Sequence, residues 1–504
     1  MPTIKKATGL TPTEQHLAKL ADDTFLDLWS WPNVFKKPGK ELCDLLVVCG
    51  DDVLMFSDKA ISWPDAPFQT AWSRWYNKAI ADSADQIRKA DLWLKKSPKA
   101  VFADGKCQQP IPIELPPISQ RRVHGICVAT GAEEAASQYF NDPDGTFMIF
   151  PHLKGSDHAN FAALGHEPFC IGDVDPDGPF VHVFNMATLG IVMAEFDTIT
   201  DFTRYLNARA ELIRSQRLTL APSEAEMVAN YLLTIEPSGE HRFPVGTDIP
   251  GHSADPDMGL QFVQGEYAFL ARSPEYRRRR EANRISYEWD RLIGFFTREV
   301  LNGTQYSILD TEPSVELAER ALRIMAREDR LQRRVLASAI IGARRALEEQ
   351  KADRFARIAV STDRTTGEKI AYVFVVLAGA DKMEQTVYRQ ARAAMLQAYC
   401  LATLHDDRDI KLCVGIAITA ISDKGDSEDL IVYPQQDWTP EFIEELRAAR
   451  EQFEILQNPT ALTRAPIIAT TFPPDPAFEG MSRQQRRALE RQRAKQERQT
   501  TRRR

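Results

Sequence analysis

Residues 40–61, KELCDLLVVCGDDVLMFSDKAI, place charged side chains around two apolar runs at a spacing suited to phosphodiester chemistry. The runs flank a Gly-Asp-Asp turn signal at 50–52, so the stretch predicts an antiparallel β-hairpin. Asp44 opens the first strand and Lys59 lies near the end of the second, which brings both charges to one side of a small sheet. A carboxylate can hold Mg²⁺, and a lysine can stabilise charge on a phosphate. The pattern therefore indicates metal-dependent hydrolysis of phosphodiester bonds.

Two helices and a further strand are predicted around this hairpin. The pattern predicts a helix over 11–31 with Glu14 in its first turn, a long helix over 68–96, and a strand over 121–130. Ser83 and Gln86 on the long helix are expected either to face the site or to belong to a solvated polar face. Helix, hairpin, helix and strand thus follow one another in this order.

This order and these residues resemble the PD-(D/E)XK restriction-endonuclease-like superfamily, nearest to its Mrr-like and NERD-like branches, over roughly the first quarter of the chain. The resemblance implies a glutamate on the first helix, a metal-binding aspartate at the start of the hairpin, and a (D/E/Q)-x-K motif in its second strand. The matching positions are Glu14, Asp44 and the Ser-Asp-Lys sequence at 57–59. It also implies Mg²⁺ as the cofactor, with Mn²⁺ as a substitute.

Ser57 departs from the family pattern, because it stands where the second acid is expected. Asp58 supplies a carboxylate one position later, but strand alternation directs it to the face opposite Lys59. Three alternatives follow: a bulge re-aims Asp58, Glu41 or Glu14 supplies the missing ligand, or the site is weakened or inactive. Glu14 has a second interpretation as a carboxylate that stabilises the helix N-terminus.

The expected site and function follow from this resemblance. The expected metal ligands are Asp44, Glu14 and Asp58, and the wider catalytic set adds Lys59, Glu41 and Ser57. The expected function is a metal-dependent nuclease, with DNA favoured over RNA, in restriction or anti-phage defence by family analogy. The alternative is an inactive nuclease fold that acts as a nucleic-acid-binding or assembly module.

Composition and cysteine usage indicate a protein of the cytoplasm. The 504 residues are 43% apolar and 27% charged, which is ordinary for globular proteins and enough for two to four domains. No apolar run approaches the ~18 residues that span a bilayer, and the N-terminus has no signal-peptide core, so neither membrane association nor export is expected. The seven cysteines form no CxxC pair, so we expect reduced thiols.

The net charge of −8 hides an asymmetry along the chain. Residues 481–504 hold ten Lys or Arg and two Glu, so the first 480 residues carry −16. A nucleic acid would therefore meet local basic patches rather than an overall positive field. The basic tail is expected to be a solvated helix or an arm that folds on nucleic acid or an acidic partner.

Four regions are predicted along the chain. They are a nuclease-like α/β domain at 1–215 with a mixed sheet flanked by helices, a mainly helical central region at 216–350, a second small α/β module at 351–460, and a linker with the basic tail at 461–504. The C-terminal half is expected to contact a protein partner or a second copy of the chain. Arginine-rich helices at 274–351 indicate a solvated face more than a nucleic-acid ridge.

Two further groups of polar residues resemble metal sites only superficially. His152, His158 and His166 match no ligand spacing, so structural or surface roles are expected. The sequence GDVDPDG at 172–178 resembles a calcium loop, but its proline and the missing downstream glutamate favour an acidic turn.

Overall fold

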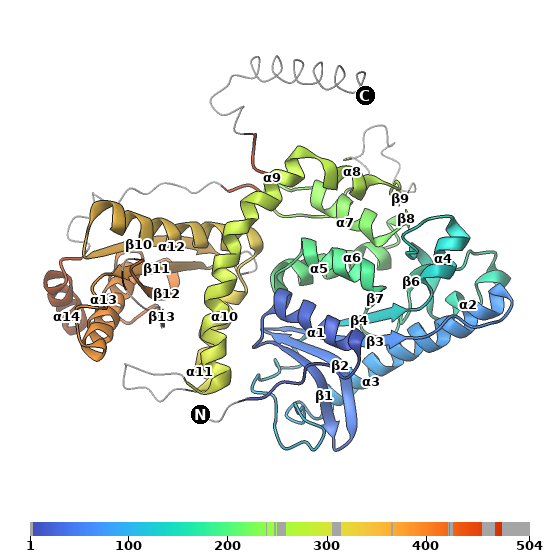
Figure 1. Ribbon diagram of the computed structural model, residues 1–504, viewed down its shortest axis with the longest axis horizontal. Coiled ribbons are helices and arrows are strands. Elements are labelled where there is room, and N and C mark those ends of the chain that lie inside the picture. Colours follow the sequence, from blue (N-terminus) through green and yellow to red (C-terminus); the bar gives the residue numbers. More distant parts are fainter. Residues whose placement is uncertain are drawn as a thin grey trace, which may run out of the picture.

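A five-stranded mixed sheet forms the centre of the N-terminal half in the computed structural model (Figure 1). The structure describes residues 4–237, 239–245, 248, 259–304, 314–363, 366–421, 423, 427–455 and 469–475. The spatial order is β1-β2-β3-β4-β7, and β4 and β7 run parallel to β3 whereas β1, β2 and β3 form an antiparallel meander. The strands are β1 (Ser30–Lys37), β2 (Lys40–Cys49), β3 (Asp52–Ala60), β4 (Arg122–Thr130) and β7 (Val181–Phe184).

The predicted hairpin is confirmed. β2 and β3 pair from Leu45 opposite Phe56 to Cys49 opposite Asp52. Gly50 in the connecting turn has a φ of 61°, a left-handed conformation that glycine adopts without steric cost. The apolar residues of both strands are fully buried, because helices cover both faces of the sheet.

The first predicted helix is shorter than expected. α1 (Pro12–Phe25) begins after Thr11, whose hydroxyl accepts a hydrogen bond from the Glu14 backbone, but the prediction of a helix to residue 31 is wrong. The segment after it forms β1, which contains Pro32 and a left-handed Asn33 with a φ of 47°. A proline is tolerated there because β1 is the edge strand of the sheet.

Helices lie on both faces of the sheet. α1 packs on β1, β2 and β3, and contacts α5 (Met186–Glu195), which packs on β4 and β7. The other face is covered by α3 (Asp82–Lys96). The predicted helix at 68–96 is helical throughout, but α2 (Phe68–Tyr76) joins α3 through a π-helical turn, Asn77–Ala81.

Shorter elements complete the N-terminal half. The short strands that the sequence predicts at 145–185 are present, and one of them is β7 of the main sheet. The elements are α4 (Glu133–Phe140), β5 (Met148–Lys154), the 3₁₀ turns Gly155–His158 and Phe161–Leu164, β6 (Cys170–Asp173), α6 (Ile199–Arg214), β8 (Leu218–Leu220), α7 (Glu224–Leu233) and β9 (Leu260–Gln261).

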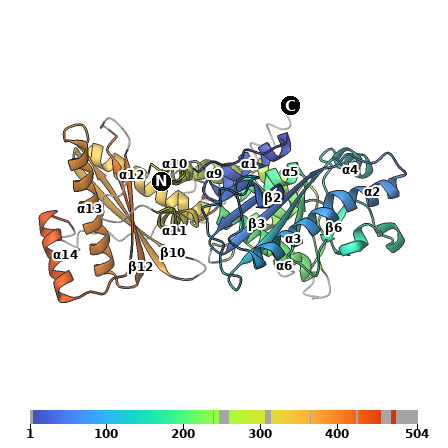
Figure 2. The ribbon, with the colours of Figure 1, turned by 90° about the horizontal axis from the view of Figure 1, so that it is seen from below.

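A helical region separates this half from a second sheet, as Figures 1 and 2 show. Its elements are α8 (Glu266–Arg272), α9 (Pro274–Asn283), the 3₁₀ turn Arg284–Ser286, α10 (Tyr287–Asn302), α11 (Val315–Ala326) and α12 (Arg330–Gln350). The predicted polar linker at 236–259 falls partly outside the described residues, and the basic tail falls wholly outside them. No helix in the described ranges combines the length and apolarity needed to cross a bilayer.

The predicted C-terminal α/β elements are present. The second sheet has the order β10-β11-β12-β13, with α12 on one face and α13 on the other, where α14 packs on α13 (Figure 2). The elements are β10 (Arg354–Thr362), β11 (Lys369–Leu377), α13 (Gln385–Asp406), β12 (Ile410–Thr419), β13 (Glu428–Pro434) and α14 (Pro440–Gln452).

One hydrophobic core connects the two sheets. It includes Phe56 of β3, Trp289 of α10 and Tyr372 of β11, all fully buried. A buried hydrogen bond crosses the same region, because the Trp29 indole N–H donates to the Glu319 carboxylate of α11 at 2.9 Å. The two halves are therefore packed as one body rather than joined by a loose linker.

Trp29→Phe is expected to lower the free energy of unfolding by about 1–3 kcal/mol, because the buried Glu319 carboxylate would lose a donor that water cannot replace. Urea unfolding followed by far-ultraviolet circular dichroism measures this change. The matched control is Trp93→Phe, which removes a bond from the indole to the Ala100 carbonyl at 3.2 Å in a partly exposed place. An equal loss in both variants would contradict the importance of the Trp29 bond.

Candidate functional site

The candidate site lies where β2 and β3 separate. The described pairing of the two strands ends at Leu45 and Phe56, so Asp44 and Ser57 lie just beyond it. Asp44 is 9% exposed as a residue, and its Oδ2 accepts a hydrogen bond from the Asp58 backbone N–H at 2.6 Å. This bond fixes the Asp44 carboxylate against the end of β3.

Consecutive residues of β3 point to opposite faces of the sheet. The Ser57 hydroxyl lies 3.2 Å from the Ser83 hydroxyl and 3.3 Å from the Gln86 amide oxygen, both on α3. Asp58 points to α1, where Thr13 is its hydrogen-bond partner. The pairing of β3 with β4 is regular from Asp52 to Ala60, so no bulge at this pairing re-aims Asp58. Lys59 therefore shares the face of Ser57.

Two glutamates are joined by a buried amide. Asn33 Nδ2 donates to Glu14 Oε2 at 2.9 Å and to Glu41 Oε1 at 3.0 Å. Glu14 also accepts from the Leu10 backbone N–H at 2.8 Å. Glu14 therefore lies in the first turn of α1, as expected, and is also connected through Asn33 to Glu41 near the candidate site.

Burial and mutual repulsion perturb the carboxyl groups. Burial, with added repulsion from Glu41 and Glu14, raises the pKa of Asp44 to about 6, although the Asp58 backbone and Lys59 act in the opposite direction. Burial also raises the pKa of Glu41 and of Asp58, and Glu14 adds repulsion to both. Burial would raise the pKa of Glu14 as well, but hydrogen bonds from Asn33, Leu10 and Thr11 outweigh it and lower that pKa.

Lys59 is the cation whose charge acts on all three of these acids. Its charge partly offsets the rise in the pKa values of Asp44, Glu41 and Asp58. No ion pair joins Lys59 to another side chain within the described residues. Its ammonium group is therefore available to an added anion such as a phosphate.

The donors suit a hard cation in type, but they are not gathered into a finished metal site. Asp58 Oδ1 and Asn33 Oδ1 are buried and have no hydrogen-bond partner, and oxygen atoms of this kind are the ligands that Mg²⁺ prefers. However, no three His, Cys, Asp or Glu side chains in the described ranges lie close enough together to hold a metal ion. A cation would therefore require side-chain movement of Asp58 or Glu41 towards Asp44.

Sequence reasoning missed Asn33. An asparagine in a segment expected to end a helix carries no motif, and only the tertiary structure places its amide between two glutamates. The polar helix residues Ser83 and Gln86, for which two interpretations stood open, do face the site through Ser57.

The superficial metal patterns have structural roles. The His158 ring lies 2.8 Å from the Gly155 carbonyl and accepts from the Gly172 N–H at 2.9 Å, and burial lowers its pKa to about 4. Asp173 of the acidic turn forms an ion pair with Arg214 at 2.8 Å. These residues hold the fold around β5 and β6.

Comparison of the chain with protein-family models, curated protein sequences and solved structures found no match.

Asp44→Asn is expected to stabilise the protein at neutral pH. The native state binds a proton at Asp44 more tightly than the unfolded chain does, so this group contributes stability that is fully present below pH about 4 and is lost as the pH rises through about 6. A pKa difference of this size corresponds to about 3 kcal/mol as an upper bound. Asparagine removes the buried charge but keeps an acceptor for the Asp58 N–H.

Thermal melts of both proteins at pH 7.5 and pH 4 test this prediction. The variant should melt higher than the wild type at pH 7.5, and the gap should shrink at pH 4. A gap that is independent of pH would show that charge burial at Asp44 is not its cause.

Proposed function

We propose that the chain is a metal-dependent nuclease that hydrolyses phosphodiester bonds, with DNA the first substrate to test and RNA the second. One observation carries the proposal: the Asp58 backbone holds the Asp44 carboxylate at the strand end that carries Lys59, and that lysine forms no ion pair within the described residues. The order of elements also supports it. Helix α1, the β2–β3 hairpin, helices α2 and α3 and strand β4 follow one another in the order on which the PD-(D/E)XK resemblance rests, although β1 is an additional strand between α1 and the hairpin.

Each residue has a separate role in this proposal. Asp44 would hold Mg²⁺ together with Asp58 and Glu14, and Glu41 is the alternative second acid. The bound ion would supply activation of water and neutralise charge on the phosphate. Lys59 would contact a phosphate oxygen and stabilise the charge that grows there in the transition state. Asn33 would orient Glu14 and Glu41 through its two hydrogen bonds.

A second candidate is a nuclease fold that binds nucleic acid without cutting it. Ser57 replaces the expected acid, is fully buried, and lies within hydrogen-bonding distance of Ser83 and Gln86, so its place offers no carboxylate. The lack of three gathered acids among the described residues also favours this candidate.

Asp44→Ala and Lys59→Ala are each expected to abolish metal-dependent cleavage of labelled DNA or RNA. Asp44→Ala removes the charge that makes Mg²⁺ binding possible. Lys59→Ala removes stabilisation of the transition state, on the order of several kcal/mol. Asp58→Ala should retain a measurable fraction of activity, because its side chain lies on the face opposite Lys59.

The matched control is Lys78→Ala on the same domain, since Lys78 is exposed and lies in the π-helical turn. Circular dichroism and thermal melts show that each variant is folded. Cleavage by Asp44→Ala at the wild-type rate would place the active site elsewhere.

Mg²⁺ titration separates the two candidates. For the nuclease, Mg²⁺ is expected to raise the melting temperature of the wild type at pH 7.5, because a cation relieves the repulsion among the buried acids. The same titration should leave Asp44→Asn unchanged. No Mg²⁺ effect on the wild type, together with metal-independent nucleic-acid binding and no cleavage, would favour the binding protein.

A further inference from the structure

An open groove lies between α2 and the 3₁₀ turn Phe161–Leu164. It has a volume of about 390 Å³, which is within the range found for ligand sites. One wall is formed by Gln69, Thr70, Ser73, Arg74 and Asn77, and the other by residues 159–163. None of the residues of the candidate nuclease site lines this groove.

The charge of the groove wall favours an anion. Arg74 is exposed, and it is the one charged side chain among the described residues that line the groove. It forms no ion pair in the part of the chain that the structure describes. The exposed side chains of Gln69, Asn77 and Asn160 add neutral amide donors. One unpaired cation among neutral donors suits a phosphate of a nucleic-acid backbone.

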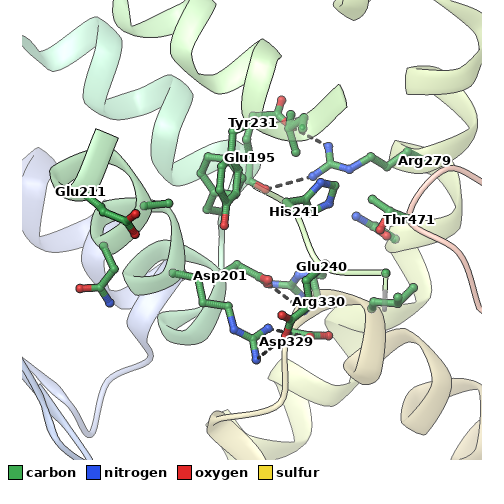
Figure 3. A pocket seen from close by; sticks show the side chains of 18 residues that line it. Glu195, Asp201, Glu211, Tyr231, Glu240, His241, Arg279, Asp329, Arg330 and Thr471 are labelled. Atoms are coloured by element: carbon green, nitrogen blue, oxygen red, sulfur yellow. Dashed lines mark hydrogen bonds and ion pairs between the residues drawn. The ribbon is translucent and has the colours of Figure 1, made fainter. Parts of the chain in front are cut away.

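A pocket among α6, α7, α9 and α12 has a different character (Figure 3). Its volume is about 320 Å³, and charged side chains of its wall are paired with one another. Arg279 forms an ion pair with Glu195, and Arg204 forms one with Asp329. An arginine that already binds a carboxylate gains less from an added phosphate. The groove beside α2 is therefore the better place for a phosphate.

Exposed aromatic rings lie next to the groove. Phe68, the residue before Gln69, is 36% exposed, and Tyr139 of the neighbouring α4 is 42% exposed. The two rings stack nearly parallel, with 5.1 Å between their centroids and 13° between their planes. Both rest against the buried Phe169, and the Tyr139 hydroxyl donates to Glu167. The aromatic pair Phe68–Tyr139 is thus held in place with part of its surface in water.

A groove with a free cation beside exposed aromatic rings is the combination that binds single-stranded nucleic acid. The backbone follows the positive charge, and unpaired bases stack on the rings. The bases of a duplex are already stacked on one another, so they gain nothing from such rings. We propose that this surface binds a single strand of nucleic acid, with a phosphate at Arg74 and a base on the aromatic pair.

The helical stretch 68–96 connects this surface to the candidate nuclease site. Ser83 and Gln86 of the same stretch lie within hydrogen-bonding distance of Ser57. Arg74 and Ser83 are about 14 Å apart along the helix, at a rise of 1.5 Å per residue. The inference rests on the proposed function for the nucleic acid as substrate, and it adds the form of that substrate.

Fluorescence-anisotropy titrations of the full chain in EDTA test the proposal, because they measure binding without cleavage. The probes are a labelled DNA single strand of about 20 nucleotides, which exceeds the length that one such surface covers, the same sequence as RNA, and the DNA duplex. At least one single strand is expected to bind at least tenfold more tightly than the duplex. Equal or tighter binding of the duplex, or no binding of either single strand, would overturn the proposal.

Two variants locate the surface. Arg74→Gln should weaken binding of the single strand and lower the slope of log affinity against log salt by about 0.7, because one phosphate contact is lost. Tyr139→Leu keeps an apolar side chain but cannot stack on a base, so it should weaken binding at least fivefold and leave the salt slope unchanged. Thermal melts show that both variants are folded. Wild-type affinity in either folded variant would contradict the assignment.

Matched controls come from α14, which lies far from α2 (Figure 1). Arg447→Gln removes an exposed arginine, and Phe442→Leu removes one ring of a stacked pair with Trp438. Both should bind the single strand like the wild type, and an equal loss in the controls would also overturn the assignment.

The nuclease proposal can fail separately. Selective binding of single strands without cleavage in any metal would remove the nuclease and leave this surface in place. Cleavage without selective binding would remove this surface alone.

Discussion

The burial of the Asp44 carboxylate is the constraint on which the candidate site depends. A charge in this position has lost most of its water, and within the protein its closest compensation is one backbone N–H at 2.6 Å. That N–H is free to donate because β2 and β3 no longer pair at this point. The end of the hairpin therefore does two things: it holds the carboxylate in place, and it leaves the carboxylate short of positive charge.

The residues around Asp44 only partly compensate for this lack of positive charge. Lys59 offers a cation, but no ion pair within the described residues holds it against an acid. Asn33 satisfies Glu14 and Glu41 with its amide hydrogens and keeps its own oxygen buried without a partner. A core selected only for stability would replace these groups with apolar side chains, since unpaired buried polar atoms are costly. These unsatisfied polar atoms are the physical argument for a ligand at this site.

The hairpin was predictable from sequence because its signals are local. Two apolar runs and a Gly-Asp-Asp turn define both strands, and Lys59 lies near the end of β3 as predicted. The prediction that Asp44 opens its strand is wrong, because β2 begins at Lys40 through its pairing with β1, which leaves Asp44 in mid-strand. β1 was missed, because Leu28 and Trp29 extend the apolar stripe of α1 and Pro32 looks like a helix stop. Asn33 was beyond sequence reasoning for another reason. Its partners Glu14 and Glu41 lie on two other elements, α1 and β2, and no sequence periodicity records contacts between elements.

The candidate nuclease site and the pocket lined by Glu195, Arg279 and His241 (Figure 3) are connected through one helix, α5. This helix packs against α1, which carries Glu14, and its last residue is Glu195 in the pocket wall. Coupling between the sites would require α5 to have a second stable position. Glu195 opposes such movement, because its side chain accepts hydrogen bonds from Tyr267, Tyr276 and Arg279, and its carbonyl accepts another from Arg279. These hydrogen bonds hold the end of α5 in one position, so the geometry disfavours coupling through movement of this helix.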